Sequence, residues 1–265
     1  MNRDLIENRL RTERLGRDLE LFDEIDVSTN DRIFELAKKG REEGCAVVAG
    51  FQKKGKGRMG RKWLGSRYEK TLAMSFLLRG CAADPRTALI AALAVTDAIE
   101  VFGNSGSVKI KWPNDIVAGG KKLCGILTEY REINGEGCVA VGIGVNISWK
   151  QLPDEIKKTA ASLADVGIVL KTEELAAEIL NAFEKRYEQL IKDAAWIQDY
   201  KKRMDGIGEK INVYDSASCG GRIESARIAH TGICEGVADD GRLLLRLEDG
   251  AVIALSGGEV SIRKE

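Results

Sequence analysis

Two turn signals in the middle of the chain constrain the fold most, because each joins one strand directly to the next. Ala118-Gly119-Gly120 separates a short strand from one that starts at Lys122, and Asn134-Gly135 separates that strand from residues 138–147. Short glycine-containing loops connect antiparallel strands, whereas parallel strands need a long crossover. We therefore expect an α+β chain with an antiparallel or mixed sheet, not a doubly wound parallel one.

The flanking segments supply the other elements of this fold. Runs of apolar residues predict further strands over 19–25, 45–51, 71–78 and 108–112. Apolar periodicity and capping residues predict helices over 1–20, around 33–37, and over 84–102, 172–190 and 194–204.

The last 60 or so residues show a different pattern of apolar and turn-forming residues. From about Gly208 the chain shows short apolar runs punctuated by Gly220-Gly221, Asp239-Asp240-Gly241 and Asp249-Gly250. That spacing is typical of a small β-barrel. We expect a domain boundary between Asp205 and Gly208, which gives a first domain over 1–206 and a second over 207–265.

Composition narrows the function classes. Lys+Arg and Asp+Glu are each 41, whereas a nucleic-acid-binding chain usually carries surplus positive charge. Six scattered cysteines and one histidine argue against a zinc site and a disulfide scaffold. The charged N-terminus lacks a signal-peptide apolar region, and the longest apolar run, 88–95, is far below the roughly 20 residues that span a bilayer. We expect a cytoplasmic protein that binds neither nucleic acid nor membrane.

Residues 55–63, Gly-Lys-Gly-Arg-Met-Gly-Arg-Lys-Trp, form the most distinctive stretch. Glycines allow a backbone to approach a ligand, cations attract an anion, and an indole offers a flat surface for stacking. The stretch predicts a loop that closes over an anion with an aromatic ring. A basic loop of this kind can also be a solvated turn, and it matches neither the Walker A nor the dinucleotide-binding pattern.

Other polar clusters have an ordinary and a functional interpretation. Ser28-Thr29-Asn30 fits a helix N-cap but also a site for a neutral polar ligand. Asn114 and Asp115 follow a proline, as turn residues do, and Lys122 alone fits a solvated strand lysine.

Together these motifs resemble the biotin protein ligases, or biotin–[carboxyl carrier protein] ligases, from about residue 20 to the C-terminus. The resemblance rests on Ser28-Thr29-Asn30, on Gln52 with residues 55–63, on KWPND at 111–115, KLCGI at 122–126, GIGVN at 142–146 and SGGEVSIR at 256–263. It implies an α+β core of the class II synthetase type, shared with lipoate ligases, followed by an SH3-like barrel.

The resemblance also implies a two-step reaction. Biotin and ATP form biotinyl-5′-AMP and pyrophosphate, and a lysine of a biotin carboxyl carrier protein then takes the biotinyl group. Mg²⁺ would accompany ATP.

Site roles carry over from the family only as expectations. The implied catalytic residues are Lys122 and Arg58, the implied metal contact is Asp115, and residues 53–65 would act as a mobile lid. Biotin would contact Ser28, Thr29, Asn30, Gln52, Lys56, Gly57, Arg58, Lys122, Gly125, Gly142 and Gly144. ATP would contact Arg58, Arg61, Trp63, Asn114, Asp115 and Asn146.

Lys56 departs from the family pattern, which commonly has arginine there; lysine keeps the charge but loses a bidentate fork. About 27 residues precede Ser28, too few for an N-terminal DNA-binding domain, so we expect a short form that acts as a ligase only. The alternatives are a lipoate-type ligase and a non-enzymatic biotin sensor or DNA-binding regulator, and the zero net charge disfavours the regulator. Dimerisation through a sheet edge is possible, and the oligomeric state stays open.

Overall fold

The structure is a computed structural model that describes residues 1–65, 69–103, 106–149, 156–192, 196–215, 227–257 and 260–264. Its core is a seven-stranded sheet in the order β1-β2-β3-β7-β6-β5-β4. The strands are β1 (Leu19–Ile25), β2 (Ala46–Gln52), β3 (Lys70–Arg79), β4 (Val108–Lys111), β5 (Asp115–Ala118), β6 (Lys121–Ile133) and β7 (Glu136–Ser148). β1 and β2 pair in parallel and all other neighbours are antiparallel. The predicted mixed sheet and both hairpins are confirmed.

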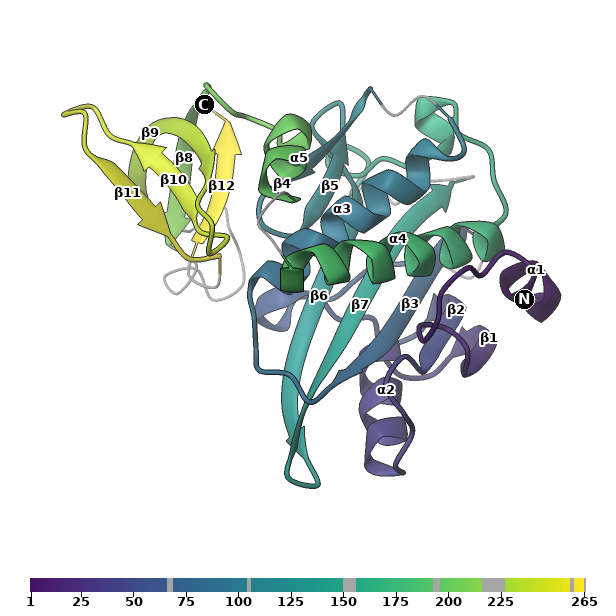
Figure 1. Cartoon of the computed structure of the whole chain (residues 1–265). Helices are drawn as coiled ribbons and strands as arrows, with labels where there is room; N and C mark the ends of the chain where they lie inside the picture. The colour runs from purple at the N-terminus through teal and green to yellow at the C-terminus, as the bar shows by residue number, and fades with distance from the viewer. Residues whose placement is uncertain are drawn as a thin grey trace.

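Helices cover the two faces of this sheet unequally. α3 (Arg86–Glu100) and α4 (Thr172–Lys192) cross one face, and α2 (Thr29–Lys38) packs on the other (Figure 1). The side chains of β3 divide accordingly: Met74 and Phe76 belong to the α3–α4 core, while Ala73 and Leu77 belong to the α2 core. This alternation is the period of two that a β-strand imposes. Of the helices in the described ranges, none is both long and apolar enough to cross a membrane.

The N-terminal helix is shorter than predicted. α1 spans only Arg3–Glu7, and the chain then follows α4 without helical structure. Glu184 of α4 accepts hydrogen bonds from the backbone N–H groups of Glu13, Arg14 and Leu15, at 2.6, 2.9 and 2.9 Å. A backbone N–H that donates to Glu184 does not also donate to the carbonyl group four residues before it, as an α-helix requires. The prediction of a helix over 1–20 is therefore wrong beyond Glu7.

The C-terminal residues form a second, five-stranded antiparallel sheet in the order β11-β10-β9-β8-β12, which fits the predicted SH3-like barrel. Its strands are β8 (Lys210–Asp215), β9 (Ile228–Val237), β10 (Leu243–Arg246), β11 (Val252–Leu255) and β12 (Val260–Lys264). The predicted turns at 239–241 and 249–250 lie between strands, and the one at 220–221 is outside the described residues. α5 (Trp196–Arg203) precedes the barrel, and the predicted boundary falls between α5 and β8.

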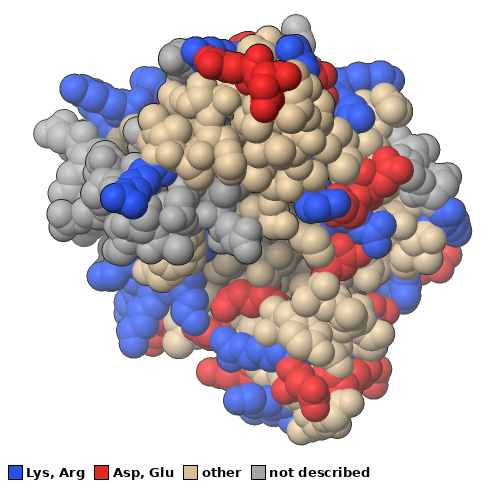
Figure 2. All heavy atoms as spheres, turned by 90° about the vertical axis from the view of Figure 1, so that its left-hand side faces the viewer, with Lys and Arg blue, Asp and Glu red and all other residues tan. Residues whose placement is uncertain are grey.

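The barrel and the linker that precedes it are each attached to the sheet by a hydrogen bond. The Trp112 indole donates to the Gly241 carbonyl at 3.0 Å, and the Asp205 N–H donates to the Ile110 carbonyl at 2.8 Å. On the face that carries the barrel, both acidic and basic side chains are exposed (Figure 2).

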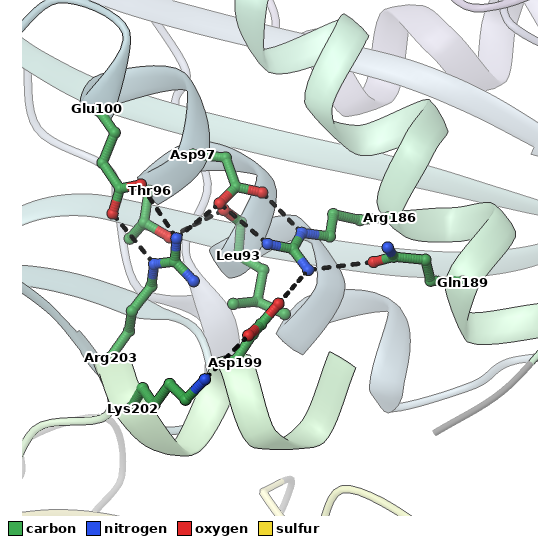
Figure 3. Close-up of polar contacts among 9 residues, drawn as sticks. All are labelled: Leu93, Thr96, Asp97, Glu100, Arg186, Gln189, Asp199, Lys202 and Arg203. Carbon is green, nitrogen blue, oxygen red and sulfur yellow. Dashed lines mark hydrogen bonds and ion pairs between the residues drawn. The ribbon is translucent and has the colours of Figure 1, made fainter. Parts of the chain in front are cut away.

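An ion-pair network joins α3, α4 and α5 (Figure 3). The Arg186 side chain, 11% exposed, lies between Asp97 at 2.6 Å and Asp199 at 2.7 Å. Arg203 contacts Asp97 at 2.9 Å and Glu100 at 3.0 Å. Each helix therefore contributes charge that another helix neutralises.

We predict that Arg186→Leu lowers the free energy of unfolding by about 2–4 kcal/mol, because it removes the buried partner of Asp199 and one of the two guanidinium partners of Asp97. Chemical denaturation measures this. Lys192→Ala is the control: it removes an exposed pair with Glu188 at 3.4 Å and should cost less than about 0.5 kcal/mol. If Arg186→Leu and Lys192→Ala lost equal free energies of unfolding, the ion pairs of Arg186 would contribute no more to stability than an exposed pair.

The pH dependence gives a second readout of the same pair. The Arg186 hydrogen bond holds the pKa of Asp199 below its usual value. Such a group stabilises the fold above its unfolded pKa, about 3.9, and this stabilisation is lost as the pH falls through the folded pKa. Arg186→Leu should therefore lose less stability than the unsubstituted protein on acidification below about pH 4.

Candidate functional site

A cavity of about 770 Å³ opens beside the N-terminus of α2, and glycines of β6 and β7 form its floor. Gly125 pairs with Gly144, and Gly142 pairs with Leu127. A Cβ at Gly142 would lie 2.3 Å from Asn30 Oδ1, and one at Gly144 would lie 2.7 Å from Trp63 Cε2. Neighbouring side chains can lie flat on the sheet only because these positions carry none.

Residues 55–63 form a small hairpin over this floor. The Gly57 N–H donates to the Arg61 carbonyl at 2.7 Å, and the Trp63 N–H donates to the Gly55 carbonyl at 3.0 Å. Met59 and Gly60 make the turn, with φ values of 58° and 71°. The Trp63 indole rests against Gly125 and Gly144. The sequence indicated a loop here, and its movement as a lid stays a prediction.

Cations gather in the cavity although the chain as a whole is neutral. Among the described lining residues, the acids are Asp115 and Asp205, and the cations are Lys56, Arg58, Arg61, Lys62, Lys111, Lys122 and Lys158. Such an excess raises the local concentration of an anionic ligand.

Arg58 is held in the cavity by a chain of hydrogen bonds. Its guanidinium donates to Asn114 Oδ1 at 2.7 Å, and the Asn114 amide donates to the Ile126 carbonyl at 2.7 Å. Burial lowers the pKa of Arg58 from its usual value, and the Asp115 carboxylate opposes this shift. A partly desolvated cation gains from a bound anion, so the geometry favours an anion beside Arg58.

Lys122 and Asp115 form the second charged contact. Lys122 Nζ lies 2.7 Å from Asp115 Oδ1. The angles do not suit a hydrogen bond, and within the described ranges this buried oxygen has no hydrogen-bond donor. Lys122 Nζ is also 5.6 Å from the centre of the Trp63 ring. The ammonium, the carboxylate and the indole therefore meet in one part of the cavity.

The other end of the cavity is polar but uncharged. Ser28 caps α2, since its Oγ accepts from the Asn30 N–H at 3.2 Å. Gln52 Oε1 accepts from the Thr29 N–H at 3.1 Å. Ser75 of β3, fully buried, lies 2.7 Å from Thr29 Oγ1 and 2.6 Å from Asn30 Oδ1. The cap interpretation of this segment is therefore correct, and its side chains also reach the cavity.

The structure brings all but one of the expected site residues to the cavity lining. Lys56 lies there but pairs with Asp31 at 2.6 Å. The exception is Asn146, whose buried amide donates to the Ala161 carbonyl at 2.9 Å and the Lys122 carbonyl at 3.3 Å. It supports the strand that carries Lys122, and its predicted nucleotide contact stays a prediction.

Sequence reasoning missed Ser75, together with lining residues such as Lys111 and Lys158. A signal for Ser75 was present, because it is the polar residue in the middle of the apolar run 71–78.

Two family models match the chain. The Biotin/lipoate A/B protein ligase family matches residues 22–146, and the Biotin protein ligase C terminal domain matches residues 222–263. The bifunctional ligase/repressor BirA of Bacillus spizizenii is 34% identical over 248 residues, which cover 91% of this chain and 73% of that protein. The biotin–[acetyl-CoA-carboxylase] ligase of Mycobacterium tuberculosis is 29% identical, over 89% of this chain and 86% of that protein. Among solved structures, the biotin protein ligase from Aquifex aeolicus in complex with biotin and ATP is similar with a TM-score of 0.78 and 27% identity, over 94% of this chain and all of that one.

We predict that Gly142→Ala lowers the free energy of unfolding by about 1–3 kcal/mol, because the new Cβ displaces Asn30 from its packed position. Denaturant titration measures the loss. Gly103→Ala is the matched control, since its Cβ would make an ordinary contact, 3.5 Å from Ile168 Cγ1, and should change stability by less than about 0.5 kcal/mol. An unchanged free energy of unfolding in Gly142→Ala would show that the cavity floor tolerates a side chain at this position.

Proposed function

Since this chain belongs to the biotin protein ligase family, we propose that it activates biotin with ATP and transfers the biotinyl group to a lysine of a biotin carboxyl carrier protein. The observation that carries this proposal is the two-ended cavity. A neutral polar end at Ser28 and Thr29 adjoins a cationic end at Arg58 and Lys122 across a glycine floor. This arrangement suits a ligand with an uncharged polar ring on one side and phosphates on the other.

The first step joins two anions. A carboxylate oxygen of biotin attacks the α-phosphorus of ATP, the bond to the β-phosphate oxygen breaks, and pyrophosphate leaves. Two unit charges about 4 Å apart repel by about 4 kcal/mol at an effective dielectric of about 20. Arg58 and Lys122 reduce this repulsion and stabilise charge in the transition state. Asn114 holds the Arg58 guanidinium in place for this role.

The second step forms the amide. The acceptor lysine, as a neutral amine, attacks the carbonyl carbon of the mixed anhydride, AMP leaves and the amine loses a proton. Water would destroy the anhydride, so closure over it is required. We assign that closure to residues 53–65. Trp63 would have to leave Gly125 and Gly144 before a ligand lies there, and it would then stack on adenine while Arg61 faces the phosphates.

Mg²⁺ would bind at Asp115. Its buried Oδ1 lies 2.7 Å from the Lys122 ammonium but has no hydrogen-bond donor of suitable geometry in the described ranges. Among those residues, no group of three or more acidic, cysteine or histidine side chains could hold a metal by itself. Mg²⁺ commonly uses one or two carboxylates together with phosphate oxygens, so this donor set fits. When bound, the ion would neutralise phosphate charge.

Several features favour this function over its alternatives. The C-terminal match is to the biotin protein ligases specifically, which disfavours a lipoate-type ligase. The relatives are ligases by name, which disfavours a sensor without activity. We further propose that the protein acts in the cytoplasm and that any homodimer uses a sheet edge, where β1 has a neighbour on one side only in the described sheet.

The decisive experiment is transfer of labelled biotin to a purified carboxyl carrier domain, followed together with biotin-dependent release of pyrophosphate. We expect both with biotin and neither with lipoate. Pyrophosphate release with lipoate alone would favour the alternative ligase. Biotin binding without pyrophosphate release would favour the sensor.

We predict that Lys122→Ala lowers the rate of adenylate formation at least about tenfold, because one positioned charge in such a site is worth more than a factor of ten, while the fold is kept. Single-turnover pyrophosphate release measures the rate, and circular dichroism checks the fold. Lys121→Ala is the control, since this exposed neighbour contacts only the Lys157 carbonyl, at 3.4 Å, among the bonds described for its side chain. Near-normal turnover of Lys122→Ala would remove the role assigned to it.

A further inference from the structure

A line of polar groups runs under the neutral end of the cavity, from Glu129 on β6 through Asn30 and Ser75 to Thr29. We call it the polar line. Ser75 and Glu129 do not line the cavity itself, yet each contacts a residue that does. The direction of each hydrogen bond along the polar line follows from which of its groups can donate and which can only accept.

The amide of Asn30 has one possible orientation. Its Nδ2 lies 2.7 Å from Glu129 Oε2 and 3.1 Å from the Leu127 carbonyl oxygen. A carboxylate and a carbonyl only accept, so the NH₂ group must face them. The amide oxygen Oδ1 therefore faces Ser75, 2.6 Å away.

The proton of Ser75 follows from this orientation. A hydroxyl carries one proton, and Ser75 Oγ touches two oxygens, Asn30 Oδ1 and Thr29 Oγ1. Asn30 Oδ1 can only accept, so Ser75 donates to it. The Thr29 hydroxyl must then donate to Ser75 Oγ across their 2.7 Å contact.

The result is a fixed pattern of donors and acceptors in the cavity. Thr29 Oγ1, whose proton is used, has lone pairs left for a ligand N–H. Ser28 Oγ accepts from the Asn30 N–H and keeps its own proton for donation. Gln52 Oε1 accepts from the Thr29 N–H, which leaves its NH₂ group to donate. An acceptor and donors that line the same end of the cavity complement a ligand in which an N–H is bonded to a carbonyl group.

We infer that Ser75 and Glu129 are positioning residues that fix Thr29 as a hydrogen-bond acceptor and thereby select a cyclic urea over a ring in which oxygen replaces the N–H. This inference deepens the proposed function and rests on it for the identity of the ring. Such replacement turns a donor into an acceptor, and two facing acceptors repel, so a small change in the ligand should have a large effect on binding.

The test measures dissociation constants by titration calorimetry for biotin and for its two cyclic-carbamate analogues, in which either ureido N–H is replaced by oxygen. In Ser75→Ala the Thr29 hydroxyl loses its acceptor and can rotate to donate into the cavity. We expect biotin to bind about tenfold more weakly, and the preference for biotin over one analogue to fall about tenfold, the scale of a single hydrogen bond. Thr96→Ala is the control: it removes another buried hydroxyl, one that donates to the Leu93 carbonyl at 2.8 Å far from the polar line, and should change neither quantity.

Glu129 provides a variant with less risk to folding, since its side chain is 26% exposed. Glu129→Leu should lower the preference several-fold, and Glu129→Gln, which restores an acceptor oxygen, should recover most of it. An unchanged preference in Ser75→Ala, or equal weakening of all three ligands, would overturn the inference. Because binding is measured without turnover, a protein that binds biotin but forms no adenylate would contradict only the proposed ligase activity.

Discussion

The cavity depends on the absence of side chains at three strand positions. Gly125, Gly142 and Gly144 lie where β6 and β7 pair, in the interior of the sheet. A side chain at any of them would collide with a residue that now rests on the backbone. The sheet is otherwise covered by helices through its alternating apolar residues, so these glycines are what keeps one part of a packed face open to a ligand.

Polar neighbours position two of the cationic side chains in the cavity. Asn114 orients Arg58, and Asp115 lies beside Lys122. These partners hold the cations in position, which reduces the ordering that must accompany binding. Asp115 offsets the charge of Lys122 without a hydrogen bond of good geometry to it. A phosphate or carboxylate can therefore improve on contacts that the protein makes alone.

The sequence predicted the features that depend on residues close together in the chain, namely the hairpins and the motifs that line the cavity. Asn134-Gly135 fixed the β6–β7 hairpin, and with it the pairing of Gly125 with Gly144, because the turn sets the register. The motifs also placed most of the cavity lining, because each lies within a strand, at the end of one, or at the start of a helix. Contacts between residues far apart in the chain were not predicted. The helix that ends at Glu7 does so because α4, more than 160 residues away, binds the backbone that follows. Asn146 sits in a motif, but its amide turns to a segment that the motif does not contain.

The attachment of the barrel has a thermodynamic consequence. Gly206 and Ile211, at and beyond the expected boundary, contribute to the cavity wall, and Trp112 beside them is bonded to Gly241 of the barrel. A ligand that reached this part of the wall would contact both domains, and its binding free energy would then strengthen their association through mass action. Substrate occupancy and domain cohesion are linked equilibria: whatever loosens the barrel weakens binding, and saturation with ligand resists separation of the two parts.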